Sequence, residues 1–135
     1  MAIKPWVTFQ PTEPGGEYLA LLTELPLRRW RDLPRFVRYS LAIQRQLKDT
    51  PGVIGYSLNA HLFARRFWTL SVWQDDAALA QFVGRTPHSN AMTGLAGRMG
   101  ATRFVRWTIH GSDYPIAWPA ALERRTVEAS AGAAG

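Results

Sequence analysis

Cysteine is absent from this chain of 135 residues, which excludes a disulfide framework and a thiolate-bound metal site. Long apolar runs are lacking as well, because no stretch approaches the ~18 residues that a membrane-spanning helix needs. The first residues, MAIKPWVTFQPTEPGG, hold no continuous apolar segment of the kind found in signal peptides. We therefore expect a cytoplasmic protein without a membrane span.

Common catalytic and metal-binding motifs are missing too. The sequence contains no GxSxG nucleophile motif, no phosphate loop and no dinucleotide fingerprint. Its histidines, His61, His88 and His110, are not spaced as in HxxxH, so we predict no dedicated metal site. Asp75 and Asp76 are adjacent carboxylates, but their place before a helical pattern is more typical of a helix cap.

Lysine is scarce, and arginine carries most of the formal net charge of +6. Five arginines lie close together before and within the first predicted helix: Arg28, Arg29, Arg31, Arg35 and Arg38. They lack the glycine and aromatic pattern of an RNA-binding strand. A solvated helix face is the first interpretation, an anionic ligand or partner the second, and nucleic acid the last, so no nucleic-acid partner is expected.

The residues that are present predict one α+β domain. Length and the 47% apolar content indicate a single globular unit. Apolar periodicity and turn residues predict strands at 17–25, 53–63, 66–73 and 102–111, and helices at 33–49, 75–92 and 118–125. Thr50-Pro51-Gly52 is expected to end the first helix, and the second is expected to break near 85–87, where Thr86 caps a restart with Pro87 at its first position. The longer elements form a ferredoxin-like split βαβ order with a four-stranded antiparallel sheet. Residues 1–16 are expected to form an N-terminal arm, 17–126 the domain, and 127–135 a disordered tail.

The alternation of side chains divides the predicted strands into two faces. A three-residue turn at 64–66 would pair Phe63 with Phe67, and paired residues share a face. The apolar set is expected beneath the helices: Ile54, Tyr56, Leu58, Ala60, Leu62, Trp68, Leu70, Val72, Val105, Trp107 and Ile109. The other set mixes polar and aromatic groups: Ser57, Asn59, His61, Thr69, Ser71, Trp73, Phe104, Arg106, Thr108 and His110.

Two interpretations of this mixed face compete. It could be a half-wet outer surface, or it could pack against a second sheet and enclose a pocket with converging polar groups. We favour the pocket, because aromatic side chains such as Trp73 and Phe104 would otherwise face water. The mixed set is then a predicted ligand-binding site.

The stretch FWTLSVWQDDAALAQFVGRTPHSNAM resembles antibiotic biosynthesis monooxygenase-like domains of the dimeric α+β barrel superfamily. The shared features are an apolar strand ending in Trp73, the acidic cap, the helix ALAQFV and the Pro87-His88 pair; TPGVIG at 50–55 is also similar. The resemblance covers about residues 17–111, as judged by element order. It extends to a spheroidene-monooxygenase-like branch that is linked to haem.

The resemblance implies a homodimer whose two sheets enclose a barrel. Members include cofactor-free oxygenases of polyphenolic compounds, haem-binding or haem-degrading proteins, and proteins of unknown reaction. Haem-degrading members use an early Asn and a Trp in the second helix. Here Phe82 stands near the place of that Trp and no Asn precedes Asn59, which disfavours haem degradation of that type.

His88 and Arg106 are the candidate catalytic residues. A neutral His88 at a helix start could accept a proton or bind haem iron, although a lone buried histidine is more often structural. The planar guanidinium of Arg106 could bind a carboxylate, enolate or phenolate, or form an ion pair with Glu24 or another acid. Three functions stay open: a homodimeric barrel that binds a planar aromatic compound and oxidises it without a cofactor, a haem protein with His88 as axial ligand, and a non-catalytic ligand-binding domain.

Overall fold

The computed structural model describes residues 2–85 and 88–125, with the side chains of residues 88–90 outside that description. The strands are β1 (Ala2–Thr8), β2 (Glu17–Pro26), β3 (Val53–His61), β4 (Arg66–Trp73) and β5 (Arg103–His110). The helices are η1 (Trp30–Asp32), α1 (Leu33–Lys48), α2 (Asp76–Gly84), α3 (His88–Gly94) and η2 (Gly111–Asp113). Residues 118–125 are also helical, as predicted. The expected cap at Thr86-Pro87 and the expected tail at 127–135 lie outside the described residues.

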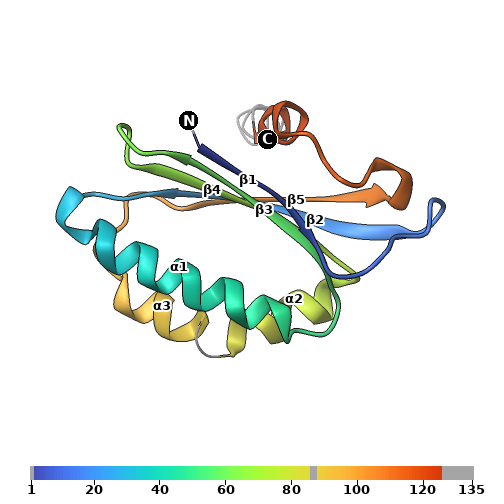
Figure 1. The fold of residues 1–135 in the computed structure, drawn as a ribbon, viewed down its shortest axis with the longest axis horizontal. Coiled ribbons are helices and arrows are strands. Elements are labelled where there is room, and N and C mark those ends of the chain that lie inside the picture. Colours follow the sequence, from blue (N-terminus) through green and yellow to red (C-terminus); the bar gives the residue numbers. More distant parts are fainter. Residues whose placement is uncertain (1, 86–87, 126–135) are drawn as a thin grey trace, which may run out of the picture.

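One antiparallel sheet in the order β1-β3-β4-β2-β5 forms the centre of the molecule (Figure 1). Its last four strands have the split βαβ connection that the sequence predicts. The prediction of four strands was wrong, because residues 2–8 pair with β3 and add a fifth. The alternation of Trp6 and Val7 thus indicates an edge strand in the part of the chain that was expected to be an arm.

The helix ends follow from local chemistry. The Asp75 side chain accepts a hydrogen bond of 2.8 Å from the Ala78 amide, so the predicted cap of α2 is confirmed. α1 ends at Lys48, and Gly52 takes the positive φ of 85° that the following turn requires. Asp32 precedes α1 but does not cap it, because its carboxylate accepts a 2.6 Å bond from Arg98 instead.

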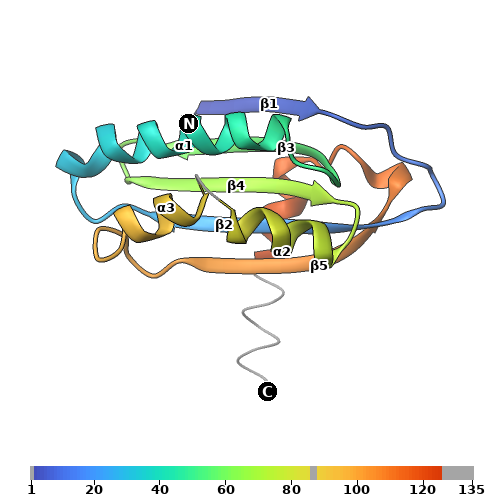
Figure 2. The same cartoon turned by 90° about the horizontal axis from the view of Figure 1, so that it is seen from below.

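Helices α1, α2 and α3 cover one side of the sheet, which we call the helix face (Figures 1 and 2). Two apolar clusters lie there, one around Trp73 and Phe82 and one around Phe36 and Phe67. Each cluster joins side chains of the helices to side chains of the strands. The helix face is therefore a two-part core rather than one continuous apolar layer.

The predicted hairpin register was wrong. β3 ends at His61 and β4 begins at Arg66, so four residues separate the strands instead of three. Asn59 consequently pairs with Trp68 rather than with Ser71. The partner of Asn59 thus differs from the predicted one by three residues, and an odd shift transfers every side chain of β3 to the other side relative to β4, because side chains alternate between faces.

The side of the sheet away from α1, α2 and α3 is called the opposite face, and residues 111–125, the C-terminal segment, lie across it (Figure 1). Most of the apolar residues expected beneath the helices are found here instead, whereas Tyr56, Leu58 and Ala60 of β3 do lie beneath the helices. The cluster on the opposite face contains Ala20, Leu22, Ile54, Trp68, Leu70, Val72, Val105 and Ile109 from the sheet, with Ile116, Trp118 and Ala121 from the segment. Trp68 is buried as predicted, although on the opposite face instead of under the helices. Trp107, which we expected to be buried, and Arg65, which we expected to be exposed, are both half-buried.

Candidate functional site

The helix face carries most of the predicted site residues. Register places Thr69, Ser71, Trp73, Phe104, Arg106, Thr108 and His110 on this face, on β4 and β5. The helices above β4 bury Ser71 and Trp73, and the Trp73 indole donates a 2.8 Å hydrogen bond to the Ser71 hydroxyl. These residues are thus brought to one side of the sheet, although beneath the helices rather than against a second sheet.

A row of hydroxyl groups crosses the middle of the helix face. Thr23 of β2 lies directly opposite Thr69 of β4, and Phe104 of β5 lies on the other side of Thr23. This row separates the two apolar clusters of the helix face. No hydrogen bond links the hydroxyl of Thr23 or Thr69 to another residue in the described part of the chain. Thr23 is buried and Thr69 half-buried, so their hydroxyls can orient polar groups of a ligand.

The hydroxyl row reaches solvent at the β5 edge. Phe104 is 64% exposed at this edge, and Thr108 and His110 are exposed along the same strand. Arg106 makes a 3.3 Å ion pair with Asp76. Both partners of this pair are more than half exposed, so water and salt weaken it and the guanidinium can exchange partners. The ion pair expected as the structural alternative for Arg106 is thus present, with Asp76 as the acid rather than Glu24, which lies on the opposite face.

Helix α3 begins at His88, and it packs beside α1 and α2 on the helix face (Figure 2). The side chain of His88 is not among the described ones, so its predicted roles as acid–base group and haem ligand stay predictions. Gly94 at the other end of α3 lies against Tyr39 of α1 so closely that a Cβ there would collide with the phenol oxygen. Close packing at Gly94 therefore fixes the height of α3 above the sheet.

The opposite face holds the other predicted site residues, Ser57, Asn59 and His61. The Ser57 hydroxyl donates to the Lys4 carbonyl at 2.6 Å and accepts from the Trp118 indole at 2.9 Å, which is a structural role. His61 packs edge-on against Trp68, with 4.9 Å between ring centroids. They do not join the predicted residues of β4 and β5 in one pocket.

Two buried polar atoms on the opposite face have no hydrogen-bond partner among the described residues, Asn59 Oδ1 and Trp68 Nε1. Asn59 and Trp68 are directly opposite each other on β3 and β4. A buried donor or acceptor without a partner costs about 1–3 kcal/mol. Asn59 is therefore the predicted site residue on this face whose hydrogen bonding is least satisfied by the chain itself.

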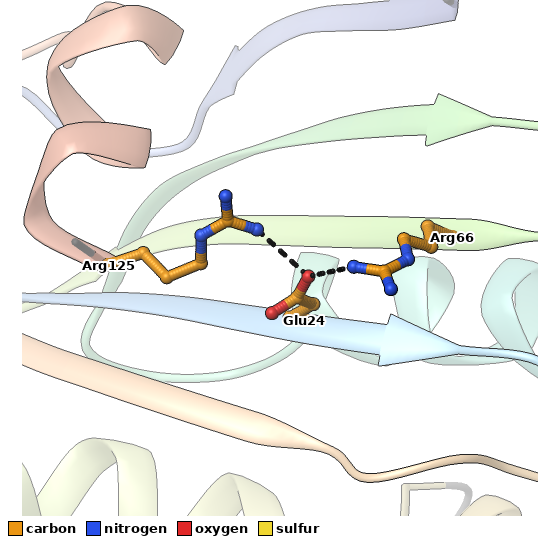
Figure 3. A network of polar contacts seen from close by, with 3 residues as sticks. All are labelled: Glu24, Arg66 and Arg125. Carbon is orange, nitrogen blue, oxygen red and sulfur yellow. Dashed lines mark hydrogen bonds and ion pairs between the residues drawn. The ribbon is translucent and has the colours of Figure 1, made fainter. Parts of the chain in front are cut away.

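Glu24 is a charged group of the opposite face that sequence reasoning missed as a site residue. Its carboxylate is buried and accepts bonds from Arg66 at 3.2 Å and from Arg125 at 3.0 Å (Figure 3). With Arg103 these residues line a hollow of about 590 Å³ at one end of the sheet. A charged residue within the apolar run of β2 is the sequence signal that could have found it.

Tyr114 is the residue whose pKa is most clearly changed by burial. Its hydroxyl shares a 2.7 Å hydrogen bond with Thr8, and its ring packs edge-on against Trp6 at 5.0 Å. Burial raises the pKa of Tyr114 above its usual 10.0, against the lowering effect of the Thr8 bond. The contact between β1 and the C-terminal segment therefore favours the neutral phenol of Tyr114.

Metal-binding geometry is not found in the described ranges 2–85 and 88–125, where no three His, Asp or Glu side chains cluster. The same part of the chain has no helix long and apolar enough to cross a membrane. No protein-family model and no curated protein matches the sequence.

Solved structures do match the fold. A presumed monooxygenase from Lactobacillus acidophilus is 12% identical with a TM-score of 0.61, and the match covers 78% of this chain and 51% of that one. This chain thus spans about half the length of that protein. A presumed antibiotic biosynthesis monooxygenase from Caulobacter crescentus is 17% identical with a TM-score of 0.61, covering 69% and 90%.

The cofactor-independent oxygenase SnoaB from Streptomyces nogalater, in a mutant form, is 15% identical with a TM-score of 0.52, and the match covers 68% of this chain and 92% of that one. Identities this low establish the fold and leave the reaction open. This chain shares the α+β fold of these antibiotic biosynthesis monooxygenase-like structures, and it has a five-stranded sheet with a C-terminal segment across one face.

Proposed function

We propose that this protein binds a planar aromatic compound between the helices and the sheet and oxidises it with O₂ without a bound cofactor. The observation that carries the proposal is the row of Thr69 and Thr23 hydroxyls, which runs between two apolar clusters and ends at the exposed Phe104. Few polar groups in an apolar setting are typical of small-molecule sites. The fold shared with a cofactor-independent oxygenase supports this choice of reaction.

The substrate in this proposal is a phenol or enol that can lose a proton. The anion itself supplies the electrons to O₂; one oxygen atom enters the product and the other leaves as water. The guanidinium of Arg106 stabilises the anion at the edge of the site, and its exposed ion pair with Asp76 is weak enough to be displaced. His88 is the proposed base, since α3 begins there on the helix face.

A hydroxyanthrone is a suitable probe, because it is planar and its anion reacts with O₂. We expect oxygen uptake by the protein without any added cofactor. Arg106→Gln should lower kcat/KM about tenfold or more, the usual scale of one lost charge-assisted contact to a reacting anion. Arg103→Gln is the matched control, since Arg103 lies on the same strand but its side chain is on the opposite face.

Equal losses in the two arginine variants would contradict a site on the helix face. Binding of the probe that needs Arg106 but leaves the oxygen concentration unchanged would indicate the alternative, a non-catalytic ligand-binding domain. Titration with haemin tests the remaining alternative: a Soret shift that His88→Ala abolishes would make His88 an axial ligand and replace the oxygenase proposal.

We also propose that the chain forms a homodimer, as the resemblance to dimeric α+β barrels implies. A sheet face that one helix layer leaves uncovered is no longer an argument for a dimer, because the C-terminal segment buries much of the opposite face. The exposed ring of Phe104 on the β5 edge strand is the observation that now supports self-association. Light scattering at micromolar concentration should give twice the chain mass, and a monomer there would refute the dimer.

A further inference from the structure

One end of the molecule carries most of its arginines. We call this the basic end and define it as residues 27–38, 62–66 and 98–103. Its arginines are Arg28, Arg29, Arg31, Arg35, Arg38, Arg65, Arg66, Arg98 and Arg103. Asp32 is the one acidic residue in these described ranges, and it is buried in a 2.6 Å ion pair with Arg98. Arg66 pairs with the buried Glu24, and the arginines of the basic end other than Arg66 and Arg98 form no ion pair within the described residues.

Backbone contacts hold the three segments of the basic end together. The Leu27 amide donates to the Arg65 carbonyl at 2.8 Å, and the Arg28 amide donates to the Arg98 carbonyl at 3.0 Å. The Arg65 guanidinium lies 5.6 Å from the centre of the Trp30 ring. The hairpin between β3 and β4 and the connection from β2 to α1 therefore present one joined surface (Figure 1).

Apolar side chains project from the basic end. Phe63 at the hairpin tip is 97% exposed, and Leu62 and Trp30 are each close to half exposed. A phenyl ring that is fully exposed at a tip makes no contribution to the core of its own chain. An exposed apolar group surrounded by cations is typical of a surface that meets an amphipathic partner.

Six of the seven exposed acids in the described ranges lie at the other end of the molecule, next to the starts of β2 and α2 and the ends of α1 and β5: Glu13, Glu17, Asp49, Asp75, Asp76 and Asp113. The seventh, Glu123, lies in the C-terminal segment. Three of the six, Glu13, Glu17 and Asp75, line a hollow of about 650 Å³. This separation of charge orients the molecule in a field, so that an anionic surface attracts the basic end first.

We propose that the basic end docks on the surface of an anionic lipid bilayer, with Phe63 and Leu62 inserted at the level of the headgroups. Arginines near a bilayer surface gain attraction from anionic lipids, and aromatic side chains favour the membrane interface. The phosphates of a nucleic-acid duplex would pair with the arginines, but the duplex would leave the projecting side chain of Phe63 in water. The bilayer is the partner that uses both features, and it adds peripheral binding to a chain whose described helices do not span a membrane.

Sedimentation with lipid vesicles tests this docking. Vesicles of phosphatidylcholine and phosphatidylglycerol at roughly 3:1 should bind the protein in about 0.1 M NaCl, whereas pure phosphatidylcholine should not. Phe63→Ser should weaken binding about tenfold through lost insertion. Arg28→Ser with Arg29→Ser should weaken it about 25-fold, from about fivefold for each arginine near the surface.

Matched control variants distinguish an effect of the position of the substituted residues from an effect of the lost net charge. Arg45→Ser with Lys48→Ser removes the same charge from exposed positions near the far end of α1, and Met92→Ser removes another exposed apolar side chain. Both controls should bind within about twofold of the parent. A loss in the Arg45 and Lys48 variant equal to that of the Arg28 and Arg29 variant would refute docking by the basic end. Binding to a DNA duplex that needs Arg28 and Arg29 but is unchanged in Phe63→Ser, without vesicle binding, would assign the surface to nucleic acid instead.

Discussion

The buried carboxylate of Glu24 allows a direct test of whether a buried charge in this fold requires its ion-pair partners. Glu24 is 5% exposed, while the side chains of its partners Arg66 and Arg125 are 53% and 32% exposed. The three groups therefore differ in what happens when a partner is lost. The arginines can return to water, but the carboxylate cannot.

We expect the double variant Arg66→Met and Arg125→Met to lose about 3–5 kcal/mol of unfolding free energy, because it leaves a buried carboxylate without a counter-charge. Methionine keeps much of the apolar stem of arginine, so loss of packing is a minor cause. Glu24→Gln alone should cost only about 1–2 kcal/mol, since its amide oxygen still accepts from both guanidinium groups.

The decisive measurement is the triple variant, which adds Glu24→Gln to the two methionines. Urea unfolding followed by tryptophan fluorescence should show the triple variant to be about 2 kcal/mol more stable than the double variant. Such a rescue cannot arise from packing, because the third substitution removes charge without filling space. A triple variant as unstable as the double one would show that Arg66 and Arg125 act through packing and that the charge of Glu24 is not what requires them.

Three further outcomes are expected. Trp68→Ala should cost about 3–5 kcal/mol in urea unfolding, as for other large buried side chains, and a cost below about 1 kcal/mol would contradict its burial. Asp75→Ala should cost about 0.5–2 kcal/mol through the lost α2 cap, whereas Asp76→Ala, whose carboxylate is exposed, should be close to neutral in the same assay. Burial raises the pKa of Tyr114 above 10.0. The contribution of its neutral phenol to the free energy of unfolding is therefore complete below that pH and is lost as the pH rises through the folded-state pKa. Tyr114→Phe should abolish this alkaline loss in unfolding midpoints measured from pH ~8 to ~11, and an unchanged alkaline limb would refute the assignment.

Local signals predicted the elements of the core fold well. β4 has the predicted bounds, Asp75 caps α2, and the turn at Gly52 ends α1 as expected. Each depends on chemistry within a few residues, which a sequence displays directly. The fifth strand was missed because Pro5 and a bulge between Lys4 and Val7 interrupt the alternation of β1.

Which side chains share a face of the sheet was harder to predict, because for β3 it depends on the register of one hairpin. The aromatic ring of Phe63 favoured a strand position and a short turn, yet it projects from the tip at 97% exposure. This single misplacement transferred Ser57, Asn59 and His61 to the wrong face relative to β4. The pairing of Thr23 with Thr69 was not predicted, because β2 and β4 are distant in sequence and no turn between them indicates their register.

The contacts between the two chain ends have a consequence for how the protein folds. The Trp6 indole donates to the Ile116 carbonyl at 2.9 Å, and the Ser57 hydroxyl joins Lys4 to Trp118. Bonds between residues so distant in sequence form after the strands between them, because closing a long loop is entropically unfavourable. β1 and the C-terminal segment therefore constitute one late-forming cooperative unit, and amide hydrogens in both should exchange together, ahead of those in β4. Shortening the chain at either end would release the other end as well.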